Sequence, residues 1–153
     1  MVKEGDIAPA FKLMGSDGKE HSLSEFAGEA VVLYFYPKDD TPGCTIEAKD
    51  FNKHLDELTL LANVIGISSD DYESHCKFRD KYGLKFLLLS DTTHEISTAY
   101  DSYANKGIFG KGVVRNTFII GKNGTILRIY KKVNPLNHGQ GVLNDLKELL
   151  HVP

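Results

Sequence analysis

The sequence lacks long hydrophobic runs. Nowhere do its apolar residues approach the roughly 18 in a row that a membrane-spanning helix needs, and residues 1–6 contain no apolar core of a secretion signal. We therefore expect a cytoplasmic protein that does not enter a membrane. Neither sign of charge is in large excess, since 18 Lys and Arg are balanced by 21 Asp and Glu. The cations are spread along the chain, which argues against a nucleic-acid or anionic-membrane surface.

Cysteine is scarce as well. The chain has only Cys44 and Cys76, and no Cys-x-x-Cys pair. Cytoplasmic thiol pools keep ordinary disulfides reduced, so catalytic or inert cysteines are favoured over a structural bridge. The histidines show no zinc-like spacing with either cysteine, so we expect no metal. The 153 residues fit a single domain, 1–153, which is long enough to bury a stable core without a disulfide or a structural metal.

The rest of the chain alternates strand and helix patterns. Apolar runs predict strands at 31–36, 63–68 and 86–89, and helical patterns lie at 42–60, 71–82, 92–100 and from 138 onward. Short strands at 11–14 and 21–23 predict an N-terminal hairpin, with a helical turn at 24–26, and Asn123-Gly124 joins strands at 113–120 and 125–131. Residues 103–112 are expected to be a loop. This order predicts an α/β, thioredoxin-like sandwich with a central mixed sheet flanked by helices, and the strand at 31–36 as the sheet centre.

Cys44 stands where the strand at 31–36 gives way to a helix. Thr41 fits the N-cap of that helix and Pro42 fits its first position, where a missing N–H costs nothing. The sulfur would then face unpaired backbone N–H groups at the positive end of the helix dipole. Such a place favours a thiolate, although the dipole alone contributes only about 1 kcal/mol and strong activation needs a cation as well.

The segment around Cys44 carries a family resemblance. The spacing Pro37-x3-Thr41-x2-Cys44 resembles the active-site signature of peroxiredoxins, in particular the branch called bacterioferritin comigratory protein or PrxQ. The similarity extends over nearly the whole chain, through residues 5–9, 74–75, 77–78 and 115–119. It covers far more than one short motif.

The resemblance implies a thiol-dependent peroxidase that reduces hydrogen peroxide and organic hydroperoxides and uses no bound cofactor. Cys44 would become a sulfenic acid, and thioredoxin or a similar dithiol would return it to the thiol. The resemblance places Arg115 against the sulfur, and a guanidinium is always charged and presents a fork of donors. Thr41, which can donate or accept, would contact a peroxide oxygen, and Pro37 would shield the sulfur from water.

The sequence departs from the family pattern at one position. Many similar proteins carry a second cysteine five residues after the first, where this chain has Lys49. Some relatives place the resolving cysteine on the next predicted helix, which here carries Cys76 at the margin of its apolar side. A disulfide needs Cα atoms within about 7 Å, so joining two helix-bound cysteines requires one segment to unwind locally. The alternative is a one-cysteine enzyme regenerated by an outside thiol, with Cys76 a bystander.

Two other functions stay open at this point. The first is a thiol-disulfide oxidoreductase on the same fold, although such enzymes use Cys-x-x-Cys. The second is a non-catalytic binding or holdase protein. The sequence is compatible with a monomer or a homodimer.

Overall fold

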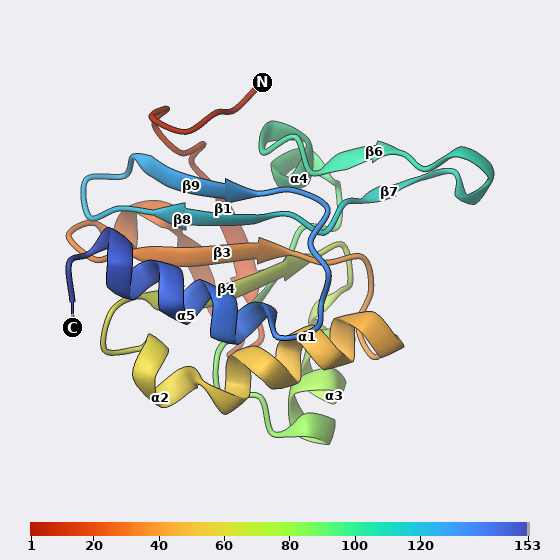
Figure 1. Ribbon diagram of the computed structural model, residues 1–153. Coiled ribbons are helices and arrows are strands. Elements are labelled where there is room, and N and C mark those ends of the chain that lie inside the picture. The colour runs from red at the N-terminus through yellow and green to blue at the C-terminus, as the bar shows by residue number, and fades with distance from the viewer. Residues whose placement is uncertain (153) are drawn as a thin grey trace.

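The computed structural model describes residues 1–152, so Pro153, the last residue of the predicted domain, lies outside the described residues. A mixed sheet of seven strands forms the centre of the molecule (Figure 1). Its strands follow the order β2 (Glu20–Ser22), β1 (Lys12–Gly15), β5 (Leu87–Ser90), β4 (Asn63–Ser68), β3 (Val31–Phe35), β8 (Thr117–Ile120) and β9 (Ile126–Tyr130). The strands β3, β4 and β5 pair in parallel, and the outer strands pair antiparallel.

Helices cover both faces of this sheet. The α-helices are α1 (Pro42–Lys53), α2 (Leu55–Leu58), α3 (Tyr72–Tyr82), α4 (Glu95–Ala99) and α5 (His138–Leu149), and two 3-10 turns lie at η1 (Leu23–Phe26) and η2 (Gly107–Phe109). Buried residues of α1, α3 and α5 pack with Val32 and Tyr34 of β3 on one face. On the other face Val31, Leu33 and their neighbours pack with the N-terminal segment and the α4 region. The architecture is the thioredoxin-like sandwich that the sequence predicts.

All five residues of β3 are buried, because the strand has a neighbour on each side and a helical layer on each face. Tyr34 lies opposite Gly66 in β4 and opposite Thr117 in β8. At the last residue of the strand, the Phe35 N–H donates to the carbonyl of Asn116 at 2.8 Å. The antiparallel β8 therefore begins beside the point where β3 ends, and this brings Arg115 to the start of α1.

Several predicted elements differ from the observed ones. The predicted loop at 103–112 is wrong, because β6 (Tyr103–Asn105) and β7 (Lys111–Val113) pair there as a separate two-stranded sheet. The predicted strand at 113–120 is two strands, separated at residues 114–116, and the predicted helix at 42–60 breaks at His54. The middle strand of seven is β4, one place from the predicted β3. The N-terminal hairpin, η1 and the strand at 63–68 are confirmed.

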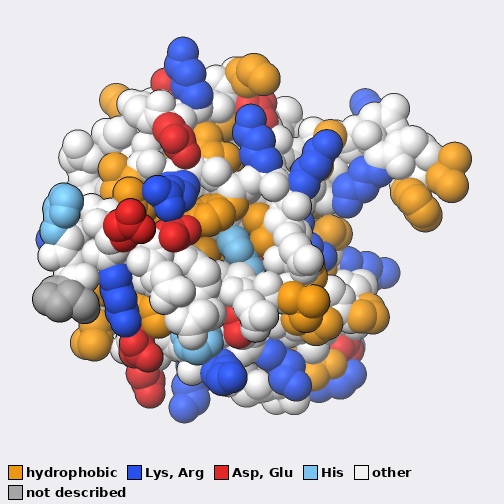
Figure 2. Space-filling model, in the orientation of Figure 1, with side chains coloured by type: hydrophobic (Ala, Val, Ile, Leu, Met, Phe, Trp, Pro, Cys, Tyr) orange, Lys and Arg blue, Asp and Glu red, His pale blue; other side chains and the backbone are white. Residues whose placement is uncertain are grey.

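The β6–β7 hairpin projects from the body as an arm (Figure 1). Hydrophobic side chains gather at the tip of this arm (Figure 2), where Ile108 and Phe109 are 95% and 83% exposed.

No helix within residues 1–152 is long and apolar enough to cross a membrane.

Candidate active site

Cys44 lies in the first turn of α1, on the segment that leaves β3. Pro42 occupies the start of the helix as predicted, and Thr41 has the extended backbone of an N-cap, with φ −91° and ψ 156°. The backbone N–H groups of a first helical turn have no partner within the helix. Cys44 is only 1% exposed, so its sulfur is surrounded by protein groups rather than by open solvent.

Thr41 takes the predicted position, but its side chain makes a different contact. Its hydroxyl donates to the carbonyl oxygen of Lys38 at 2.8 Å instead of accepting from the helix. A hydroxyl has one hydrogen and two lone pairs, so this bond uses the donor and leaves acceptor capacity. The contact also ties the residues before Cys44 into a tight turn, on which Pro37 is partly exposed.

Arg115 reaches the sulfur from the segment just before β8. Its Nη2 lies 3.4 Å from Cys44 Sγ, and its Nη1 lies 2.8 Å from Glu47 Oε1. Burial opposes the charge on the guanidinium, but Cys44 and Glu47 outweigh it and raise the pKa of Arg115. The planar fork of the guanidinium spans both partners at once, which a lysine could not do.

Glu47 is a site residue that the sequence analysis did not identify. Its side chain is fully buried and lies one helical turn after Cys44, on the same face of α1. Burial raises the pKa of Glu47 to about 7, against the opposing effect of Arg115. Within residues 1–152 its Oε2 has no hydrogen-bond partner. The sequence did carry one sign of this burial, because Glu47 falls on the same helical face as the buried residues Cys44 and Phe51.

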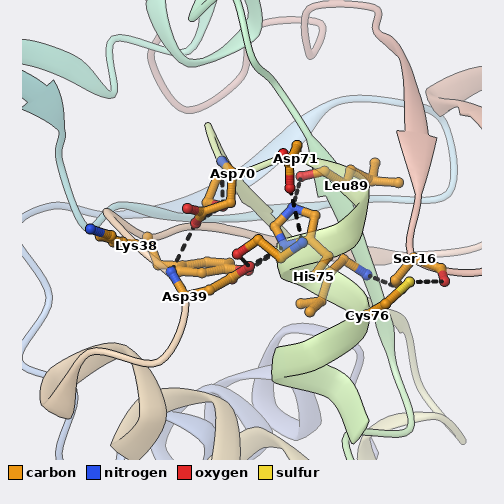
Figure 3. Close-up of polar contacts among 12 residues, drawn as sticks. Ser16, Lys38, Asp39, Asp70, Asp71, His75, Cys76 and Leu89 are labelled. Carbon is orange, nitrogen blue, oxygen red and sulfur yellow. Dashed lines mark hydrogen bonds and ion pairs between the residues drawn. The ribbon is translucent and has the colours of Figure 1, made fainter.

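Cys76 does not join this group. It lies half-buried on α3, and its Sγ contacts the carbonyl oxygen of Ser16 at 3.6 Å, in the turn between β1 and β2 (Figure 3). Four strand steps separate β1 from β8, at roughly 4.8 Å each. The two sulfurs therefore contact regions near opposite sides of the sheet, and both cysteines are free thiols.

A second polar cluster connects the Cys44 segment to α3. Ligand-type atoms of Asp39, Asp70 and His75 lie within 4.8 Å of one another, a composition that could hold a metal ion. These atoms are already bonded within the protein: His75 Nδ1 lies 2.8 Å from Asp39 Oδ2, and the Asp39 N–H donates to Asp70 Oδ2 at 2.8 Å (Figure 3). We therefore interpret the cluster as a hydrogen-bond network.

Comparison with known proteins identifies relatives of nearly full length. The sequence profile of the AhpC/TSA family matches residues 5–129. The chain is 42% identical to peroxiredoxin Bcp of Bacillus subtilis over 152 residues, covering 97% of each chain. It is 40% identical to peroxiredoxin Bcp of Escherichia coli over 151 residues, covering 96% of this chain and 97% of that one.

Solved structures agree with these relatives. A cysteine-to-serine variant of PrxQ from Xylella fastidiosa superposes with a TM-score of 0.92 at 34% identity, over 97% of each chain. The bacterioferritin comigratory protein of Xanthomonas campestris, described for its alkyl peroxide reduction activity, superposes with a TM-score of 0.87 at 37% identity, over 90% of each chain.

Proposed function

The chain belongs to the AhpC/TSA family, in its Bcp/PrxQ peroxiredoxin branch, and is a thiol-dependent peroxidase; from this we propose that Cys44 is the residue that attacks the peroxide. The observation that carries the assignment is the 3.4 Å contact between Arg115 Nη2 and Cys44 Sγ. A fixed cation beside a sulfur at a helix start stabilises the negative charge of the reacting atoms.

The reaction at Cys44 is a displacement at oxygen. The thiolate attacks the terminal oxygen of a hydroperoxide, the O–O bond breaks, and Cys44 keeps that oxygen as a sulfenic acid. The departing oxygen leaves with the electron pair of the broken bond and takes a proton from water, giving an alcohol or water. Arg115 and the Cys44 N–H are the donors that stabilise the charge growing on that oxygen.

Thr41 has a defined part in this step. Because its hydrogen is committed to the Lys38 carbonyl, its hydroxyl oxygen is available to accept from the O–H of the incoming hydroperoxide. That bond would orient the terminal oxygen toward the sulfur. Pro37, at the end of the β3 segment, is proposed to limit the access of water.

Cys76 is proposed as the resolving thiol. Its sulfur attacks the sulfur of the Cys44 sulfenic acid, a disulfide forms and water leaves. Ser16, which Cys76 contacts, and Arg115, which Cys44 contacts, lie beside strands that are four steps apart in the sheet, a separation on the order of 20 Å at roughly 4.8 Å a step. The two sulfurs must therefore move much closer before a disulfide can form. A folded α3 cannot provide that movement, and part of the helix must unwind.

The family uses a hydroperoxide as oxidant and a dithiol as reductant. We propose thioredoxin or a similar dithiol protein as that reductant, and both hydrogen peroxide and organic hydroperoxides as substrates. The alkyl peroxide reduction described for the Xanthomonas campestris relative supports the second substrate class. We propose that the protein works in the cytoplasm as a monomer or homodimer, without nucleic acid or membrane.

Intact mass tests the two cysteine roles. The reduced protein is treated with one equivalent of hydrogen peroxide, and a loss of about two mass units on a single chain is expected for the Cys44–Cys76 disulfide. Cys76→Ser should gain about 16 or 32 units instead, and Cys44→Ser should show neither change. Wild-type protein that gains mass as Cys76→Ser does would establish a one-cysteine cycle. Oxidation that persists in Cys44→Ser would remove Cys44 from its role.

A further inference from the structure

Asp39 is held by side chains from two separate elements. Its Oδ1 accepts from the Tyr36 hydroxyl at 2.6 Å, and its Oδ2 accepts from the Ser74 hydroxyl at 2.8 Å. His75 Nδ1 also lies 2.8 Å from Oδ2, and the side chains of His75 and Asp39 are 0% and 3% exposed. Ser74 and His75 belong to α3, while Asp39 belongs to the segment that carries Cys44. Figure 3 shows His75 pointing from α3 toward Asp39 and Cys76 pointing away from it.

The buried His75 ring is hydrogen-bonded at both of its nitrogens. Its Nε2 lies 3.0 Å from the carbonyl oxygen of Leu89, which can only accept, so Nε2 carries a hydrogen. Its Nδ1 faces a carboxylate that already accepts two hydroxyl hydrogens. One hydrogen bond joins the imidazole directly to the Asp39 carboxyl group, and both ring nitrogens and both carboxyl oxygens have partners. Such a buried contact is costly to break, because it leaves polar groups without a partner.

The segment that carries Cys44 makes a second contact with α3, at the surface. The Asp40 carboxylate accepts from Lys81 Nζ at 2.8 Å and from the Tyr82 hydroxyl at 2.6 Å. The side chains of Lys81 and Asp40 are 58% and 42% exposed, and exposed pairs contribute little. Asp39 and Asp40 thus contact the two ends of α3, and Cys76 lies between these contacts.

We propose that His75, acting through Asp39, is a positioning residue for the resolution step: their pair holds α3 folded against the Cys44 segment and limits how often Cys76 can leave Ser16. This inference rests on the proposed roles of Cys44 and Cys76. It concerns the rate of the second step, while Arg115 and Thr41 act in the first.

The pair therefore decides between two fates of the Cys44 sulfenic acid. In one, Cys76 displaces water and the disulfide forms. In the other, a second hydroperoxide oxidises the sulfenic acid to sulfinic acid and is itself reduced to an alcohol or water. A tight pair slows disulfide formation and gives the second peroxide more time, so this chain should over-oxidise more readily with the pair than without it.

Asp39→Asn tests the proposal, and Asp40→Asn is its matched control. An asparagine has one acceptor oxygen where the aspartate has two, so it cannot accept from Tyr36, Ser74 and His75 together. In the reduced protein, hydrogen exchange of the α3 amides should become about tenfold faster in Asp39→Asn and change less than about twofold in Asp40→Asn. Rapid-quench mass spectra should show disulfide formation about tenfold faster and less sulfinic acid, with the first peroxide step unchanged.

The outcomes separate this inference from the proposed function. Unchanged α3 exchange in Asp39→Asn would overturn the positioning role, and so would a slower first peroxide step, because Asp39 would then act on the attack by Cys44. Wild-type protein that forms no disulfide would instead reject Cys76 as the resolving thiol, and with it any effect of the pair on resolution. If Asp39→Asn fails to fold, Ser74→Ala removes only one donor to Asp39, and a smaller acceleration of both rates is expected.

Discussion

Arg115 bridges Glu47 and Cys44: its Nη1 donates to Glu47 Oε1 at 2.8 Å, and its Nη2 lies 3.4 Å from the sulfur of Cys44. The carboxylate is fully buried and the guanidinium is 16% exposed. The cation beside the sulfur is thus fixed by a carboxyl group that solvent cannot reach. Loss of either partner should affect the sulfur and the fold differently.

Arg115→Ala should slow the reaction of Cys44 with peroxide by about 10²–10³-fold, the usual effect of removing one charge-stabilising donor. The measurement is the first-turnover rate under stopped flow. Arg128→Ala removes a surface pair with Asp145 and should change the rate less than about twofold.

Arg115→Ala also leaves a buried carboxyl without its partner, so it should destabilise the protein. The double variant Arg115→Ala with Glu47→Gln removes that carboxyl and should recover stability without recovering the rate. A rate that returned together with stability would show that Arg115 acts on folding alone.

Glu47 should make stability depend on pH. Its pKa is about 7 in the folded protein and near 4.5 in the unfolded chain, so between these values the folded state holds a proton that the unfolded state has released. Stability therefore falls as pH rises from about 4.5 to about 7, by about 3 kcal/mol in all. Glu47→Gln cannot titrate, so its free energy of unfolding relative to wild type should rise over this range.

Urea unfolding at pH 5 and pH 7.5 measures this difference. Glu57→Gln is the control, because Glu57 is an exposed partner of Lys147 and should leave the pH dependence as in wild type. Other titrating groups are common to all three proteins and cancel in the comparison. If the free energy of unfolding changed with pH by the same amount in wild type and in Glu47→Gln, the buried carboxyl group of Glu47 would not be the source of the pH dependence.

The helices with clear boundary residues were the most predictable part of the fold. Asp71 caps α3 by accepting from the Ser74 N–H at 2.9 Å, and Gly83 ends the helix in the left-handed region at φ 63°. Both residue types signal helix ends in any sequence. The arm at β6 and β7 gave no such signal, because its three-residue strands pair only with each other and pack on the core only at their base, through Tyr103 and Val113.

The candidate site was predictable where the residues are close in sequence. Pro37, Thr41 and Cys44 lie on one segment, so spacing alone groups them. Glu47 was missed because an acidic side chain on a helix is usually exposed, and its burial follows from Arg115, which comes from a distant part of the chain. His75 was not identified from the sequence, because its partner Asp39 lies beside it only when α3 packs against the Cys44 segment.

Two glycines of α5 should respond in opposite ways to alanine. A Cβ on Gly139 would lie 2.8 Å from backbone atoms of Asp50 and Phe51, where α5 crosses α1, so Gly139→Ala should destabilise the fold by about 1–3 kcal/mol. A Cβ on Gly141 meets nothing within 4 Å, so Gly141→Ala should stabilise it by about 0.5–1 kcal/mol. Thermal unfolding of both variants checks the packing of α5 on α1, and equal shifts would contradict it.

Thr41 offers a test of how the peroxide is held. Thr41→Ser keeps the hydroxyl that donates to Lys38 and accepts from the hydroperoxide, so its first-turnover rate should stay within about threefold of wild type. Thr41→Val has nearly the same shape but no hydroxyl, and loss of one orienting group should slow the reaction by about 10²-fold. Because Val also loses the bond to Lys38, circular dichroism and the urea midpoint must be compared in both variants. If Val reacts as fast as Ser while both stay folded, the hydroxyl only shapes the turn, and the terminal oxygen is oriented by Arg115 and the helix N–H groups alone.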